Sequence, residues 1–253
     1  MKKTLLFAAP SIAVGIAVLG APGVASAAGV TSYQAQLAGI NHQTGSGTLT
    51  LTLNGSQATV TEKYTGLAAT FGGNPYPHVQ HIHIGAKGVC PDASADTNGD
   101  GVISTTEGAP FYGAIGATLS TSGDTSPAAG TTLTVAPAGA SADYQRTITL
   151  DAMTVASITG GTAVIVVHGD DPATLSPQAQ GEKSDLVPSL PLAATSPALC
   201  GTLTSMPNGA ANTGGGSTSG LQDGGVLAAG GALLAAGAVA GGLALRRRTA
   251  SQR

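Results

Sequence analysis

Four of the five histidines stand where their side chains could act on one ligand. His81 and His83 alternate with isoleucines, so in a β-strand the two imidazoles lie on one face of the sheet. His168 ends the apolar run 163–168, and His78 lies just before His81. Because imidazole nitrogen is a preferred ligand of copper and zinc, the spacing predicts a copper-type site of His81, His83 and His168, with His78 as a fourth ligand. The alternative is a set of hydrogen-bonded surface histidines.

Two acidic residues follow His168 almost directly. Asp170 and Asp171 are candidates to accept a hydrogen bond from the ring nitrogen that a ligating histidine turns away from the metal. We therefore expect one of these carboxylates behind the ligands, where it would fix the orientation of a ring.

Residues 96–107 carry a separate metal signature, because they fit every position of the 12-residue calcium loop of EF-hand proteins. Oxygen ligands at positions 1, 3, 5, 7, 9 and 12 would come from Asp96, Asn98, Asp100, the Val102 carbonyl, Ser104 and Glu107. Pro91 precedes the loop and Pro110 follows it, so we expect no helix on either side. The sequence predicts a lone calcium loop; the alternative is an Asn/Gly/Asp turn without metal.

The charge distribution agrees with cation binding. All 13 acidic residues lie between Glu62 and Asp223, where only four basic residues occur, so this part of the chain carries a net charge of −9. A nucleic-acid partner would require a basic surface, and no nucleic acid is therefore expected.

The N-terminal segment 1–27 has the composition of a signal peptide. Two lysines precede the apolar run 5–19, and Ala25-Ser26-Ala27 forms a small-residue cleavage site. We expect cleavage before Ala28 and export of the protein; an uncleaved membrane anchor is the alternative.

The C-terminal segments predict attachment to a membrane. Residues 205–223 form a Gly/Ser/Thr-rich stalk, 224–245 contain no charge over 22 residues, and 246–253 are basic. A helix of that length spans about 33 Å, enough to cross a bilayer with the arginines on the cytoplasmic side. Residues 210–214 resemble a sortase signal with alanine in place of leucine, so cell-wall attachment is the alternative.

The remaining segment, 28–204, has the size of one domain and the periodicity of β-strands. Residues 48–53 alternate leucine with threonine, Asn54-Gly55 suits a type I′ turn, and a return strand begins at Ala58. Further strands are expected at 33–38, 79–84, 131–135, 145–151 and 163–168. Short strands without a long amphipathic helix predict an all-β protein, an antiparallel sandwich or barrel, with two packed sheets suiting the aliphatic core.

The chain contains only two cysteines, Cys90 and Cys200. Because both lie in the exported part, we expect a disulfide bond that closes a loop of about 110 residues. Two free thiols are the alternative.

Short motifs resemble those of the chordin-type (CHRD) domain of secreted proteins. They are Leu37-Ala-Gly-Ile-Asn41, Gly47-Thr-Leu-Thr-Leu, Gly66-Leu67 and His78-Val-Gln-His81-Ile-His83.

Over 78–203 the chain also resembles Cu,Zn superoxide dismutase, a Greek-key β-barrel with a disulfide. The shared order is His81, His83, Cys90, Val166-Val167-His168, Asp170-Asp171 and Cys200-Gly201. This resemblance implies that His81, His83 and His168 match three copper ligands. The chain departs from the family because no histidine lies between 84 and 167, which removes the zinc site, and Pro197 stands where the family has its superoxide-guiding arginine.

Two functions follow as expectations. The first is an exported, surface-anchored CHRD-like domain that binds calcium, and copper at its histidines, in a binding or structural role. The second is a copper-only, superoxide dismutase-like enzyme. A cell-surface spacer without site chemistry is a third, plainer alternative.

Overall fold

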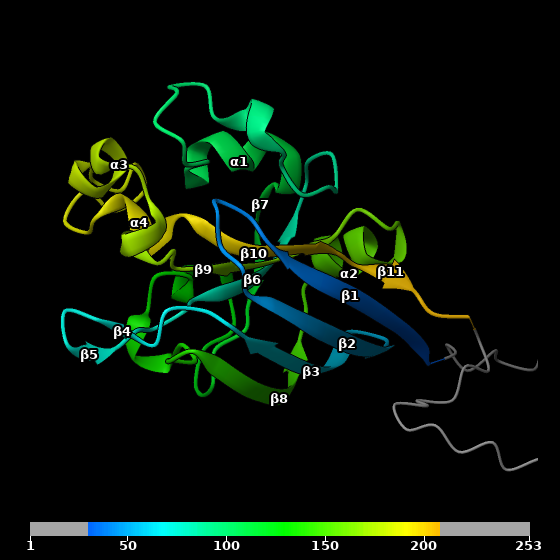
Figure 1. Ribbon diagram of the computed structural model, residues 1–253. Coiled ribbons are helices and arrows are strands. Elements are labelled where there is room, and N and C mark those ends of the chain that lie inside the picture. Colours follow the sequence, from blue (N-terminus) through cyan, green and yellow to red (C-terminus); the bar gives the residue numbers. More distant parts are fainter. Residues whose placement is uncertain (1–29, 208–253) are drawn as a thin grey trace, which may run out of the picture. The chain divides into compact units, whose positions relative to one another are not determined.

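The computed structural model describes residues 30–207 (Figure 1). The predicted signal peptide, the membrane segment 224–245, the basic tail and most of the stalk lie outside this range. Within it, no helix is long and apolar enough to span a membrane.

The described chain folds around one antiparallel sheet that curls into a half barrel (Figure 1). Its strand order is β7-β6-β9-β10-β1-β2-β3-β8, with β11 also paired to β1. The strands are β1 (Thr31–Gly39), β2 (Ser46–Asn54), β3 (Gln57–Thr65), β6 (Gln80–Ile84), β7 (Ala114–Thr118), β8 (Ser141–Thr149), β9 (Val164–His168), β10 (Pro197–Thr202) and β11 (Thr204–Ser205). The short β4 (Thr70–Phe71) and β5 (Asn74–Pro75) pair separately. The expected antiparallel β architecture is confirmed, but the long strands join one continuous sheet instead of two packed sheets.

The β2–β3 hairpin is confirmed, with its turn displaced by one residue. Asn54 pairs with Gln57, so Gly55 and Ser56 form the two-residue loop. Gly55 has a positive φ of 59°, whereas Ser56 does not adopt positive φ. A type I′ turn needs positive φ at both central residues, so the predicted type is wrong, and glycine in the first central position suits type II′.

The alternating pattern of β2 builds the main core. Leu49, Leu51 and Leu53 are buried, while Thr48 and Thr52 face solvent. On the other half of the sheet, Ile82 and Ile165 belong to the same apolar cluster. Apolar side chains on alternate positions therefore hold the curled sheet around one core, as the two-residue period requires.

Short helices and 3-10 turns surround the sheet (Figure 1). They are α1 (Thr105–Tyr112), α2 (Ala152–Thr159), α3 (Pro177–Gly181) and α4 (Leu192–Thr195), with 3-10 turns η1 (Ala93–Ala95), η2 (Pro127–Ala129), η3 (Leu133–Val135) and η4 (Pro172–Thr174). The strand expected at 131–135 is wrong, since η3 occupies this segment.

Two long-range links fasten the segment 90–112 to the sheet. Cys90 and Cys200 form the predicted disulfide, which joins residues 110 positions apart. Buried Asn41 accepts the Ile103 N–H at 2.8 Å and donates to the carbonyls of Ile103 and Pro197. The segment 90–112 is therefore joined to β10 by the disulfide, and the Asn41 side chain links it to the chain just after β1.

Removing the disulfide should destabilise the fold measurably. We expect the double variant Cys90→Ser/Cys200→Ser to lose about 2–4 kcal/mol in free energy of unfolding, because the unfolded chain is freed from a long closed loop. Urea denaturation of both proteins measures the change, and reduction of the parent protein should reproduce it. An unchanged unfolding free energy after either treatment would contradict the stabilising role.

Candidate metal centre

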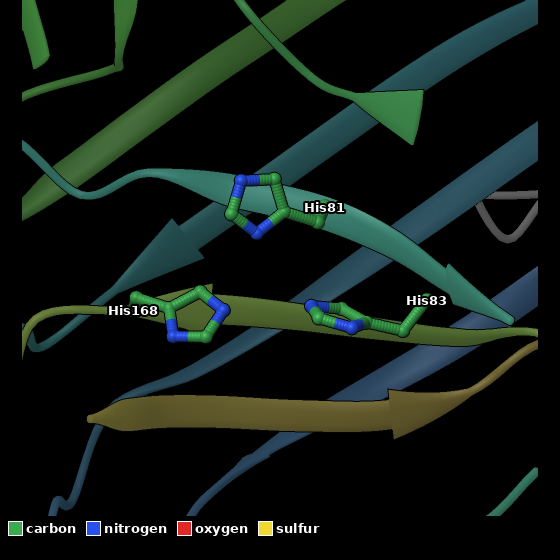
Figure 2. A group of neighbouring side chains, drawn as sticks. All are labelled: His81, His83 and His168. Carbon is green, nitrogen blue, oxygen red and sulfur yellow. The ribbon is translucent and has the colours of Figure 1, made fainter. Parts of the chain in front are cut away.

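Three histidines converge on one side of the sheet, as the alternation predicted. His81 and His83 come from β6, and His168 ends the neighbouring β9 (Figure 2). His81 lies opposite Val166 and His83 opposite Val164, so positions 164, 166 and 168 share the face of both β6 histidines. One ligand atom from each ring lies within 4.8 Å of the other two. Figure 2 shows the three rings turned towards a common space.

Backbone carbonyls fix the tautomer of each ring. The Gly130 carbonyl lies 3.0 Å from His81 Nε2, the Gly113 carbonyl 2.8 Å from His83 Nδ1, and the Thr195 carbonyl 2.7 Å from His168 Nδ1. Since a carbonyl oxygen only accepts, each of these nitrogens carries the hydrogen in the neutral ring. The remaining nitrogens are His81 Nδ1, His83 Nε2 and His168 Nε2, which are buried without a hydrogen-bond partner. Three lone pairs therefore face the centre of the cluster.

Two of the orienting carbonyls belong to glycines, and at Gly113 the backbone leaves no room for a side chain. Gly113 has a φ of 93°, and a Cβ there would stand 1.9 Å from the Ile84 carbonyl oxygen. A Cβ on Gly130 would stand 2.5 Å from Ile115. Sequence reasoning missed both residues and Thr195, because a main-chain carbonyl leaves no residue-type signal.

Burial keeps the three rings neutral. Burial, with the neighbouring His168 and His83 rings, lowers the pKa of His81 well below its usual range. Burial and His168 lower the pKa of His83 to about 3, and burial lowers the pKa of His168 to about 4. At neutral pH all three rings thus present unprotonated nitrogens, the form that binds metal.

The donor set fits a transition metal. Nitrogen ligands about 2.0–2.1 Å from one ion stand roughly 3.3–3.6 Å apart, so the rings need only a small inward movement. Imidazoles suit copper and zinc and disfavour calcium, which takes oxygen ligands. His81, His83 and His168 could therefore hold such an ion, and each already has its outer nitrogen fixed, as ligating histidines do.

His78 does not join this group, contrary to the sequence prediction. Its Nδ1 lies 3.0 Å from the His168 carbonyl and its Nε2 3.0 Å from the Ala68 carbonyl. The ring packs beside Tyr76 and Tyr64. Because β6 begins at Gln80, residue 78 lies outside the alternating strand that aims the other rings. His78 is therefore a buried residue whose ring contacts backbone carbonyls and does not face the other three histidines.

The two acids after His168 also lie elsewhere. The carboxylate of buried Asp170 makes no hydrogen bond to a histidine ring, and burial raises the pKa of Asp170 well above its usual range although the neighbouring Asn41 side chain lowers it. Asp171 caps η4 by accepting the Ala173 N–H. The predicted role behind the ligands is therefore wrong for both, because main-chain carbonyls already occupy the outer nitrogens of the rings.

The calcium-loop residues form a compact turn whose side chains bind the loop's own backbone. Asp96 accepts the N–H groups of Gly99 and Gly101, and Asp100 accepts that of Val102. Asn98 accepts the Asp100 N–H. Among residues 30–207 only the histidine cluster gathers three or more His, Cys, Asp or Glu ligand atoms, so the loop carboxylates are not drawn together here.

The prediction that no helix flanks the loop is wrong on its C-terminal side. Ser104 is the N-cap of α1, and Glu107 completes a capping box by accepting the Ser104 N–H at 3.0 Å. Pro110 stands inside this helix without preventing it. Loop position 9 therefore begins a helix and position 12 lies in its first turn, while only η1 precedes the loop.

A carboxyl from another segment also reaches the loop. Asp100 interacts with Glu182, and burial, together with this neighbour, raises the pKa of Asp100. The sequence separation of the two residues hid this contact. A cation at the loop would relieve the repulsion between the two carboxylates.

A cavity of about 380 Å³ opens beside the histidine cluster. All three clustered histidines line it, together with residues of α1, α4 and the segments around Leu133 and Leu186. A metal held by the three rings would thus have room for a further ligand on the cavity side.

Neither a scan against protein-family models nor a search of curated proteins finds a match.

Proposed function

We propose that the protein is an exported, surface-anchored β-domain of the chordin type that binds a transition-metal ion, copper by preference, at His81, His83 and His168. One observation carries the metal site: three buried nitrogens, each left with a lone pair by a carbonyl on the opposite side of its ring, face one another. Export and surface anchoring rest on the terminal segments, and the disulfide agrees with an oxidising compartment.

A loading experiment tests the proposed metal site. The full chain, purified without a polyhistidine tag, is incubated with Cu(II) or Zn(II), freed of excess metal by gel filtration and analysed for metal content. We expect about one copper ion per chain to be retained, since the Irving–Williams order favours copper over zinc at a site of imidazoles. Retention of neither metal would refute the proposed function.

Calcium at residues 96–107 is the second part of the proposal. The order of oxygen-bearing residues matches the loop, and a helix begins at position 9. Glu107 now accepts the Thr97 and Ser104 N–H groups. Binding would therefore require its carboxylate to turn from the backbone to the ion.

We expect Glu107→Gln to weaken calcium binding on the order of tenfold or more, because the loop loses a charged bidentate ligand. Glutamine still completes the capping box, so α1 should remain folded. Calcium titration calorimetry measures the difference. Asp92→Asn, which changes an acid just outside the loop, is the matched control and should bind like the parent. Equal calcium affinity in all three proteins would exclude the loop as a site.

The second candidate function is a copper-dependent superoxide dismutase-like enzyme without a zinc site. The cavity beside the rings favours it, since redox turnover needs a coordination position open to substrate. No lysine or arginine lines that cavity, so no side chain there guides superoxide towards the metal, and the binding role is favoured. Superoxide consumption by the copper-loaded chain above the rate of free copper would support the enzyme instead.

A further inference from the structure

The cavity beside the histidines is apolar and larger than a diatomic substrate requires. Aliphatic side chains form much of its wall: Val79, Ile115, Leu133, Leu186, Val187 and Leu190. Its volume of about 380 Å³ lies in the range of small-molecule sites. A diatomic anion occupies only about one or two times the 30 Å³ that a water takes in the liquid. The cavity is therefore large enough to hold a small organic molecule.

The mouth of the cavity is apolar as well. Leu133 and Leu186, both on its wall, leave 38% and 52% of their surface exposed. They come from η3 and from the loop before α4, which approach the cavity from separate parts of the chain. Large aliphatic side chains held in solvent beside a concave site favour an apolar ligand.

Away from the histidines, the cavity wall offers no charged side chain that would hold a charged group. No Asp, Glu, Lys or Arg side chain lines the cavity. The described part of the chain contains 12 acidic and four basic residues, so its field repels anions. A cation would leave its charge in an apolar cavity without a counter-charge. A neutral molecule meets neither penalty.

Among the side chains that line the cavity, the buried nitrogens without a hydrogen-bond partner belong to one wall. The unpartnered nitrogens of His81, His83 and His168 lie at the wall that these rings form. A bound molecule can therefore place one neutral donor atom at this wall and an apolar body along the aliphatic wall. A second copy or a peptide segment would instead require an extended groove.

We propose that this cavity binds a neutral, largely apolar small molecule whose single nitrogen or oxygen donor faces the three histidines. The polar end of this ligand rests on the proposed metal function, because a bound metal would accept that donor; the apolar part of the site does not depend on it. The domain then presents an organic ligand site beside its metal, which a purely ion-storing domain would not need.

Two probes that share an imidazole donor but differ in apolar surface measure how much the apolar wall contributes to binding affinity. Imidazole and 4-phenylimidazole, both neutral at pH 8.5, are titrated by calorimetry into the copper-loaded full chain. Burial of the phenyl ring should make 4-phenylimidazole bind on the order of 30-fold more tightly than imidazole. In Leu133→Glu/Leu186→Glu this ratio should fall at least about fivefold, because the wall becomes polar and charged. Met153→Glu, at a methionine 73% exposed outside the cavity, is the matched control and should keep the ratio.

The same titration on metal-free protein, followed by the methyl resonances of Ile115 and Leu190, separates the two proposals. Shifts of these methyls without copper retention would refute the metal site and support the cavity site. Copper retention with equal affinity for both probes, in parent and variants, would refute the cavity site and leave the metal site standing. Failure of both probes to bind either form would overturn the cavity proposal as well.

Discussion

Replacing Glu62 with glutamine should stabilise the protein, and the gain should grow with pH. Glu62 lies on β3 opposite Leu49 and Tyr144, is 1% exposed, and neither carboxylate oxygen has a hydrogen-bond partner. The hydroxyls of Tyr64 and Tyr144 are also buried without partners. Burial raises the pKa of Glu62 from 4.5 to about 8. The folded protein therefore holds a proton that the unfolded chain releases.

The sign of the pH effect follows from this difference. Below pH 4.5 Glu62 is protonated in both the folded and the unfolded state, so its raised pKa does not lower the free energy of unfolding there. Between pH 4.5 and about 8 only the folded state keeps the proton, so the free energy of unfolding falls as pH rises. The loss is about 3 kcal/mol at pH 7 and reaches about 5 kcal/mol above pH 8. Glutamine resembles the protonated carboxyl and does not titrate.

Urea denaturation from pH 5 to 9 measures the prediction. The difference between Glu62→Gln and the parent should rise by about 1.4 kcal/mol per pH unit up to pH 8 and then level off. Asp143→Asn on the adjacent β8, whose side chain is 76% exposed, is a control that should leave the slope unchanged. A difference for Glu62→Gln that stays constant across this range would show that the carboxyl is not buried as described.

The second large effect concerns copper affinity. We expect His168→Gln to bind Cu(II) at least on the order of 100-fold more weakly than the parent. Loss of a group that only hydrogen-bonds a ligating side chain already lowers metal affinity about 10- to 100-fold, and loss of the ligand itself should cost more. His42→Asn is the matched control, because His42 is an exposed histidine outside the cluster whose φ of 65° asparagine tolerates. Competition with a chelator of known copper affinity measures both proteins.

Stability must be followed in the same variants, because His168 is buried and its Nδ1 is hydrogen-bonded to the Thr195 carbonyl. Thermal unfolding of the metal-free forms separates loss of a ligand from loss of the fold. A folded His168→Gln protein that binds copper as tightly as the parent would place the metal elsewhere.

Alternation along strands made part of the site predictable. Ile82 and Ile84, which alternate with His81 and His83, face the core cluster, and this forces both imidazoles to the opposite face. Glu62 carries a comparable signal, since it stands between Val60 and Tyr64 on the inward positions of β3. Local spacing thus identifies which face a side chain occupies.

Contacts between distant segments could not be predicted in this way. Gly113, Gly130 and Thr195 orient the rings through main-chain carbonyls from three separate segments. The leucines at the cavity mouth likewise meet the histidines only after folding. His78 has the residue type of a ligand but the place of a core residue, and only its two carbonyl contacts distinguish these roles.

Electron paramagnetic resonance of the Cu(II)-loaded full chain tests the metal site most directly, because the nitrogens that bind copper split its spectrum. We expect coupling to the nitrogens of three imidazoles, reduced to two in His168→Gln and unchanged in His42→Asn. A spectrum of oxygen-only coordination, or one that is identical in His168→Gln, would contradict copper binding by His81, His83 and His168.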